Sequence, residues 1–375
     1  MPKIRTILFL LLVAGLLYYF YADDYKQQGA SGVWHEMKQD ASDISNSEWM
    51  TTSLAYIDDS INYLIDSVSG WIGETDESNP SVASPELDEP TEQSFSVHNI
   101  EIMEDKQSVE AELPEPARVS KNEYNTEWYT YHEHYQNFLM VAYNDAGQVS
   151  GLYTNQDLLR SKEEISLSNT KQDVRDVYGE PIDTMQKGLV RYRINDEQAQ
   201  DTFEIDNNYV TFFYDEHQNE QIAAVQIISK DMENQKENFF GEPDDSLQQG
   251  FEYQLFDLTN AARAKFDQPI LEWYDQAQTT ARGHSLDMAE NNYFSHENLE
   301  GESPFDRLEA DGIRFRTAGE NLAAGQSSSI YAHQGLMNSE GHRKNILHPD
   351  FREMAVGVAF HDDGQPFYTE AYLTQ

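Results

Sequence analysis

Two histidines and a glutamate near the end of the chain are the side chains best suited to chemistry. They are His296, Glu320 and His342, and each lies in a short polar stretch that is typical of a turn. Two neutral imidazoles can bind one divalent metal ion, with water and a carboxylate completing the shell, and zinc is the metal expected for such ligands. The same groups could instead act as acid and base in a hydrolase, or make structural hydrogen bonds to the backbone.

Several familiar catalytic arrangements are absent from the sequence. The chain has no cysteine, which excludes thiolate catalysis, cysteine zinc ligands and disulfides. It has no His-Glu-x-x-His metalloprotease helix and no nucleophile elbow. Ser295 adjoins His296 in sequence, but adjacency does not establish the hydrogen bond of a serine triad. Because catalytic zinc usually has three protein ligands and only two histidines are identified, an enzyme is not the favoured interpretation.

Four further residues are expected to support this set. His284 lies on the inner face of a predicted helix, where it would contact a ligand-bearing neighbour or the core. Asn321 is expected to hold the turn that follows Glu320. Ser295 and Ser339 directly precede groups that could do chemistry, and we assign them the same supporting role.

The helices and strands that must position these side chains are predicted within residues 251–375. Ser303 followed by Pro304 is a strong helix start, because serine caps the first turn and proline fits its first position. The apolar stretches 355–360 and 366–373 predict a β-hairpin turned at an Asp-Asp-Gly sequence. Both helices and strands are therefore expected in this region.

Residues 119–250 contain an internal repeat. Gly179-Glu180-Pro181 recurs as Gly241-Glu242-Pro243, and the apolar stretch 138–145 recurs as 209–216. Each copy predicts a hairpin, a short helix and a Gly-Glu-Pro turn, in which glycine caps the helix and proline stops it. We expect one pseudo-symmetric α+β domain with an antiparallel sheet.

The N-terminal part predicts export. Residues 1–22 place Lys3 and Arg5 before an apolar run, which indicates a signal anchor or a cleaved signal peptide. Residues 23–118 are predicted to be an acidic linker with an amphipathic helix near 51–72. Prolines, serines and acidic residues later in that range leave little apolar surface to offset the entropy of ordering.

Six short motifs follow one another in order across the C-terminal region. They are Leu258-Thr259-Asn260 with Arg263, His284-Ser285 with Asp287-Met288-Ala289, Tyr293-Phe294-Ser295-His296, Ser303-Pro304-Phe305-Asp306-Arg307, Ala318-Gly319-Glu320-Asn321-Leu322, and Asn338-Ser339 through Gly341-His342-Arg343 to Asn345-Ile346-Leu347. With these motifs the region resembles a bacterial CAP domain (cysteine-rich secretory protein, antigen 5, pathogenesis-related 1; also called SCP domain). The resemblance implies a three-layer α-β-α sandwich with a central cleft.

The resemblance also implies that His296, Glu320 and His342 match three of the four residues in the family's cleft tetrad. Many eukaryotic relatives have a second glutamate as the fourth residue; here that position is Ser339, and Glu340 is one step away. CAP domains are poorly attested as enzymes, and the activities proposed for them include lipid or sterol binding and proteolysis. The preceding repeat region resembles the CAP-associated N-terminal domain of Gram-positive bacteria, through its paired Gly-Glu-Pro pattern and its position.

The charge of the chain limits its partners. Sixty-seven acidic and 25 basic residues give a net charge of −42, which repels nucleic acid and anionic membrane surfaces. We therefore expect an exported protein on the extracellular face of the membrane, held by its N-terminal segment, or secreted if that segment is cleaved. Its cleft would bind an envelope component or a small ligand, with or without zinc. The alternatives are a cell-wall or protein hydrolase and a purely structural docking protein.

Overall fold

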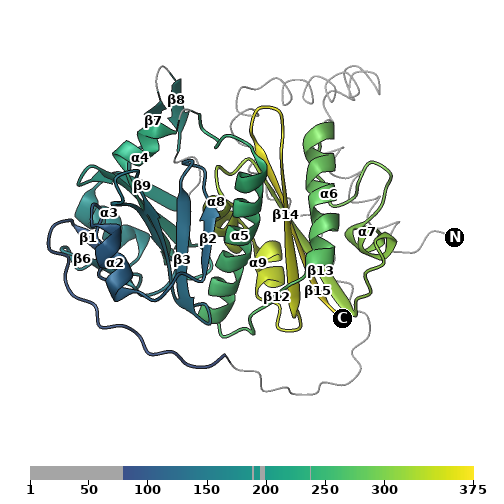
Figure 1. Ribbon diagram of the computed structural model, residues 1–375, viewed down its shortest axis with the longest axis horizontal. Helices are drawn as coiled ribbons and strands as arrows, with labels where there is room; N and C mark the ends of the chain where they lie inside the picture. Colours follow the sequence, from purple (N-terminus) through teal and green to yellow (C-terminus); the bar gives the residue numbers. More distant parts are fainter. Residues whose placement is uncertain (1–78, 188–189, 195–198, 237) are drawn as a thin grey trace, which may run out of the picture. The chain divides into compact units, whose positions relative to one another are not determined.

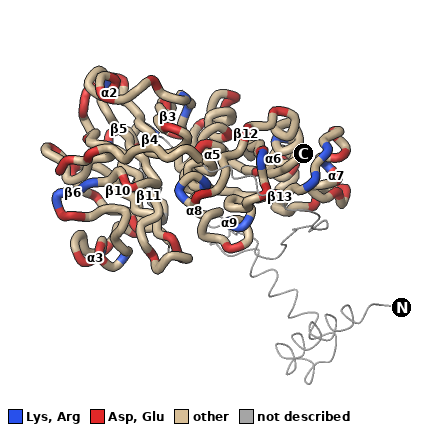
Figure 2. The backbone as a smooth tube through the Cα atoms, turned by 90° about the horizontal axis from the view of Figure 1, so that it is seen from below, with Lys and Arg blue, Asp and Glu red and all other residues tan. Residues whose placement is uncertain are grey.

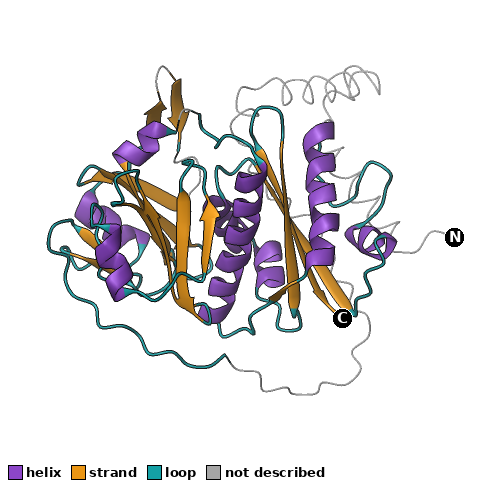
Figure 3. Ribbon diagram, in the orientation of Figure 1, coloured by secondary structure: helices purple, strands orange, loops and turns teal. Residues whose placement is uncertain are grey.

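The computed structural model describes residues 79–187, 190–194, 199–236 and 238–375. These residues form two larger β-sheets that lie side by side, with the long helix α5 (Asp245–Lys265) between them (Figure 1). Helices and strands occur in both halves (Figure 3), so the predicted α+β class is confirmed.

The predicted anchor at 1–22 and the predicted helix near 51–72 lie outside the described residues. Every helix within the described ranges is too short or too polar to cross a membrane.

The first sheet has seven antiparallel strands in the order β2-β3-β4-β5-β11-β10-β9. Its members are β2 (Arg118–Lys121), β3 (Glu127–Glu133), β4 (Gln136–Tyr143), β5 (Val149–Thr154), β9 (Gln200–Ile205), β10 (Asn208–Asp215) and β11 (Gln221–Ser229). The two copies of the repeat meet at its centre, where β5 pairs with β11. The predicted pseudo-symmetric antiparallel sheet is therefore confirmed.

Smaller elements complete this half. They are β1 (Phe95–Val97), α2 (Lys106–Glu112), β6 (Leu159–Ser161), α3 (Lys171–Tyr178), β7 (Thr184–Lys187), β8 (Val190–Arg193) and α4 (Lys230–Gln235). Val109 of α2 and Val174 of α3 are fully buried and pack in the hydrophobic core on one face of the sheet.

The two Gly-Glu-Pro turns have different structures. Gly179 ends α3 with a positive φ of 79°, and its amide donates to the carbonyl of Arg175, as predicted for a cap. Gly241 does not cap a helix, because α4 ends six residues earlier, at Gln235. A Cβ at Gly241 would lie 3.0 Å from Cα of Glu123, so this glycine permits close packing, and the predicted cap is wrong there.

The predicted linker is shorter than its 23–118 range. β1 and α2 lie inside that range and pack in the core, because the short apolar stretches there find partners far along the chain. Residues 79–94, which we call the strap, contain no helix or strand and are bound to the body by side-chain hydrogen bonds. Asn79 Nδ2 donates to the carbonyl of Gln268 at 2.8 Å, and Gln136 Nε2 donates to that of Pro80 at 2.6 Å. Glu101 accepts from three strap amides, those of residues 91–93.

The second sheet belongs to a three-layer sandwich. Its strands run in the order β12 (Glu272–Trp273), β14 (Glu353–Phe360), β15 (Pro366–Thr374) and β13 (Thr317–Ala324). The helices of this half, besides α5, are α6 (Asp275–Asn291), α7 (Pro304–Ala310), α8 (Ser329–Asn338) and α9 (Glu340–Ile346). The predicted hairpin is formed by β14 and β15.

Alternate residues of β14 face the two helical layers. Ala355 and Ala359 pack with residues of α6, whereas Val356 and Val358 pack with residues of α5 and α8. Gly357 lets α6 approach closely, since a Cβ there would lie 2.1 Å from the amide nitrogen of Arg282. The predicted α-β-α sandwich is confirmed.

The two halves share a hydrophobic core. Phe138, Met140 and Ala142 of β4 pack with α5 and α8, while the intervening β4 residues face the core that contains α2 and α3. From the C-terminal half, Leu258 and Ile330 enter this shared core, and both are fully buried. The seven-stranded sheet is therefore buried on both faces, and each half supplies part of the other's interior.

Acidic side chains are spread over both halves. Figure 2 shows Asp and Glu on many elements, whereas Lys and Arg are fewer, in keeping with the net charge of −42. The acidic character is not confined to one segment of the described residues.

Candidate functional site

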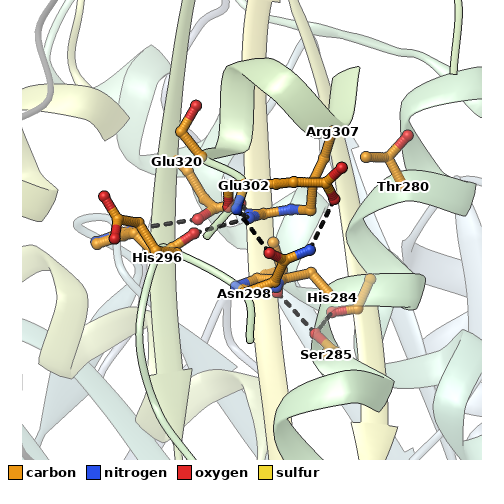
Figure 4. Close-up of polar contacts among 12 residues, drawn as sticks. Thr280, His284, Ser285, His296, Asn298, Glu302, Arg307 and Glu320 are labelled. Carbon is orange, nitrogen blue, oxygen red and sulfur yellow. Dashed lines mark hydrogen bonds and ion pairs between the residues drawn. The ribbon is translucent and has the colours of Figure 1, made fainter. Parts of the chain in front are cut away.

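Glu320, His296 and Arg307 form a hydrogen-bonded set at the edge strand β13. Glu320 Oε1 lies 2.8 Å from His296 Nδ1, and Glu320 Oε2 accepts from Arg307 Nη2 at 2.6 Å (Figure 4). All three side chains are largely buried, with 7%, 14% and 9% of their surface exposed, respectively. Both oxygens of the carboxylate are thus used within the protein.

Helix α7 places Arg307 so that it also fixes the loop before it. Ser303 and Asp306 form a reciprocal capping box at the start of α7, with Pro304 at its first position, as predicted. Arg307 Nη1 donates to the carbonyls of His296 at 2.7 Å and Glu302 at 3.1 Å. One guanidinium therefore joins the loop that holds His296 to the strand that holds Glu320.

The carboxyl group of Glu320 is held as an anion. Burial alone would raise its pKa, but the hydrogen bond with His296 and the charge of Arg307 outweigh burial and lower the pKa. Because the Glu320 carboxylate can only accept, the His296 Nδ1 bonded to Oε1 carries a proton.

His284 adds a second imidazole behind the loop. Its Nε2 donates to the carbonyl of Ser295 at 2.9 Å, and burial lowers the pKa of His284, so the ring is neutral. His284 Nδ1 has no hydrogen-bond partner among the described residues, although the side chain is almost completely buried. A small pocket beside this region, between α6, α7 and the sheet, is lined by Thr280, Phe305 and Glu320, among others.

His342 is joined to the set through the backbone of its helix. Its Nδ1 lies 2.8 Å from Oγ of Ser339, and its carbonyl accepts from Asn321 Nδ2 at 3.2 Å. Asn345, also on α9, donates to the carbonyl of Glu320 at 3.2 Å and to Asn321 Oδ1 at 2.9 Å. The predicted supporting role of Asn321 is thus a link between β13 and α9; Asn345 was missed because an asparagine in a predicted helix has no distinguishing signal.

The two candidates for the fourth position have different surroundings. Ser339 is buried and contacts His342, whereas the Glu340 side chain is 74% exposed and pairs with Lys344 at 2.7 Å. The structure brings Ser339, not Glu340, to the candidate site. Ser295 faces its own turn, where its hydroxyl accepts from the amide of Glu297.

The residues present do not amount to a catalytic zinc site. The Nδ1 atoms of His296 and His342 are bonded to Glu320 and Ser339. The described part of the chain contains no group of three or more His, Asp or Glu side chains placed to hold a metal ion. Because catalytic zinc usually takes three protein ligands, we derive no reaction step through a metal.

Two family models match the chain in the order of its two halves. Residues 102–239 match the CAP-associated N-terminal model, and residues 256–372 match the model of the cysteine-rich secretory protein family.

Known bacterial proteins resemble the chain as well. The membrane protein YlbC of Bacillus subtilis (strain 168) is 26% identical over 281 residues, which are 71% of this chain and 80% of that protein. YkwD of the same organism is 43% identical over 107 residues, 28% of this chain and 42% of that protein. The crystal structure of an extracellular protein containing an SCP domain, from Bacillus anthracis str. Ames, is 26% identical with a TM-score of 0.65 and covers 78% of this chain and 100% of that one.

Proposed function

Because the chain is a bacterial CAP-domain protein with a CAP-associated N-terminal domain, we propose that it acts outside the cell membrane as a binding module of the cell envelope. Two relatives bear names that support this location, one as a membrane protein and the other as an extracellular protein. The predicted N-terminal segment would hold the chain on the extracellular face of the membrane.

The observation that carries a binding role is the internal pairing of Glu320. Both of its oxygens are bonded within the protein and its pKa is lowered, so it is poorly suited to donate a proton to a leaving group. Its role in this proposal is to orient His296, and the proposal takes the ring as neutral, with Nε2 as the acceptor for the ligand. The expected ligand therefore offers a hydrogen-bond donor, such as an amide or amine of cell-wall peptide.

The hydrolase alternative rests on one specific feature. A histidine oriented by a carboxylate is the arrangement that activates water or a hydroxyl group in many hydrolases, and the contact of His296 with Glu320 fits it. The proposal of a binding module is preferred because the Ser295 hydroxyl, the nearest nucleophile in sequence, is bonded to its own turn.

A sedimentation assay with purified peptidoglycan separates the two functions. We expect the wild type to sediment with the insoluble wall without releasing soluble fragments or cleaving casein. His296→Ala should lower the bound fraction at least tenfold, whereas Glu340→Gln, on an exposed side chain paired with Lys344, should bind as the wild type does. Release of fragments by the wild type and not by His296→Ala would establish hydrolysis instead.

Zinc held by His296 and His342 stays a prediction of the sequence. Calorimetric titration of the wild type and of the double variant His296→Ala, His342→Ala tests it. Zinc binding that is lost in the double variant supports a two-histidine site, and equal heats in both proteins reject it.

A further inference from the structure

The end of strand β10 and the turn after it lie against the corner between α8 and α9. Asn338, the last residue of α8, donates from Nδ2 to the carbonyl of Tyr214 at 2.8 Å and accepts at Oδ1 from the amide of Glu216 at 3.0 Å. The Asn338 carbonyl lies 2.9 Å from His217 Nε2. Residues 214–217, which we call the clamp, therefore hold the end of α8 through three hydrogen bonds to a single residue.

Asp215 extends the clamp to α9. Its Oδ2 accepts from Arg343 Nη2 at 2.8 Å, and its Oδ1 accepts from the amide of His217 at 2.9 Å. The side chains of Arg343 and Asp215 are only 14% and 8% exposed, so solvent screens this ion pair less than it screens a surface pair. Arg343 Nη1 also donates to the carbonyl of Met337, which ties the two helices to each other.

The residues held by the clamp flank the Ser339–His342 pair. Ser339 directly follows Asn338, and His342 directly precedes Arg343. Ser339 occupies the N-cap position of α9, but its hydroxyl bonds His342 Nδ1 and makes no cap hydrogen bond. The orientation of this imidazole therefore depends on the corner that the clamp fixes from both sides.

We propose that the CAP-associated domain positions His342, with Asp215 as the positioning residue. The N-terminal domain then contributes to the candidate site directly, although none of its side chains is among the proposed ligand-contacting residues. The relevance of this positioning to recognition rests on the proposed function, whereas the positioning itself can be measured without a ligand.

Nuclear magnetic resonance of the full chain with ¹³C-labelled histidine tests the proposal. The His342 signal is identified by its loss in His342→Gln. We expect Asp215→Ala and Asn338→Ala to shift the ring ¹³C signals of His342, because the imidazole moves relative to Ser339. Lys121→Ala removes another ion pair between the two halves, from Lys121 Nζ to Asp244 Oδ2 at 2.6 Å, and should leave His342 unchanged.

If Asp215→Ala does not fold, the more conservative variant Asp215→Asn provides the same test. Asp215→Asn keeps an acceptor for the His217 amide but loses the charge opposite Arg343, and it should shift His342 in the same direction. An unchanged His342 signal in the folded clamp variants would overturn the proposal, as would an equal shift in Lys121→Ala. Peptidoglycan sedimentation of the same samples reports on the proposed function separately, since the wild type can fail to sediment while the His342 shifts still occur.

Discussion

Glu370 of β15 is a completely buried carboxyl group beneath the candidate site. Its Oε2 accepts from Tyr372 Oη at 2.6 Å and Asn321 Nδ2 at 2.9 Å, and its Oε1 lies 3.2 Å from Thr259 Oγ1. No cation is bonded to it in the described residues, and burial raises the pKa of Glu370 to about 7 despite these hydrogen bonds. It is therefore protonated over part of the neutral range.

This raised pKa makes stability fall as the pH rises. The folded protein keeps the Glu370 proton up to about pH 7, whereas an unfolded glutamate loses it near its ordinary pKa of 4.5. The stabilisation is complete below about pH 4.5 and is lost as the pH rises toward 7.

Glu370→Gln should remove this dependence, because an amide resembles the protonated acid. Its oxygen can accept from Tyr372 and Asn321, and its nitrogen can donate to the Thr259 hydroxyl. We expect the variant to match the wild type at pH 5 and to exceed it by about 1–3 kcal/mol at pH 8, measured by urea unfolding. Glu340→Gln is the control, with little effect at either pH; a variant less stable than the wild type at pH 8 would contradict the assignment.

At the residue scale, the sequence indicates which residues belong to the candidate site, but it does not indicate where their side chains point. The family resemblance implies that His296 and Glu320 share one cleft, and the structure places them in a hydrogen bond. The choice between Ser339 and Glu340 could not be made, because adjacent residues at a helix start point in different directions. The second contact of Glu320, with Arg307, depends on how a loop and a helix fold back onto a strand.

At the scale of elements, two glycines within helices have opposite surroundings. Gly250 in α5 faces β2, and a Cβ there would lie 2.1 Å from the carbonyl oxygen of Lys121. The contact is with backbone, so only movement of the helix or the strand could relieve it. Gly283 in α6 is exposed and would meet nothing within 4 Å.

The same substitution should therefore have opposite effects in the two helices. We expect Gly250→Ala to destabilise by about 1–3 kcal/mol or more, since overpacking exceeds the gain in helix propensity. Gly283→Ala should stabilise by up to about 1 kcal/mol. Thermal and urea unfolding measure both changes, and a neutral Gly250→Ala would mean that α5 can move away from β2 at little cost.

The elements themselves were largely predictable, but their extent and burial were not. The repeat predicted strands in the right places because its apolar stretches are long and end in turn residues. The unbroken apolar run of β4 also predicts that both faces of the sheet are buried at this strand. The partner for that second face comes from α5 and α8, far along the chain, and sequence spacing does not reveal it.

At the scale of the molecule, the shared core predicts that neither half folds stably without the other. Leu258 and Ile330 are fully buried against the seven-stranded sheet, and so is Asp257, which pairs with Arg118 at 2.7 Å. Removing the N-terminal half would expose these apolar side chains, each of which contributes about 1.5–3 kcal/mol when buried. It would also leave Asp257 without its cation.

A fragment of residues 244–375 should therefore fold poorly. We expect it to lack the cooperative unfolding transition and the near-ultraviolet circular dichroism of residues 79–375, and to associate on gel filtration. The matched comparison is a chain of residues 79–375 cleaved between the halves, which should keep both pieces together. A cooperative transition of the fragment at the urea midpoint of the longer chain would show that the halves fold separately.

The strap has a mechanical consequence for a chain pulled from its N-terminal side. Its hydrogen bonds, from Asn79 to the residues bound by Glu101, follow one another along the chain. Tension would therefore break them one at a time, as in peeling, before any force reached the β1–β6 pair. Residues 79–94, fully extended, would release roughly 50 Å of contour length. The strap would then lengthen under tension and delay the unfolding of the body.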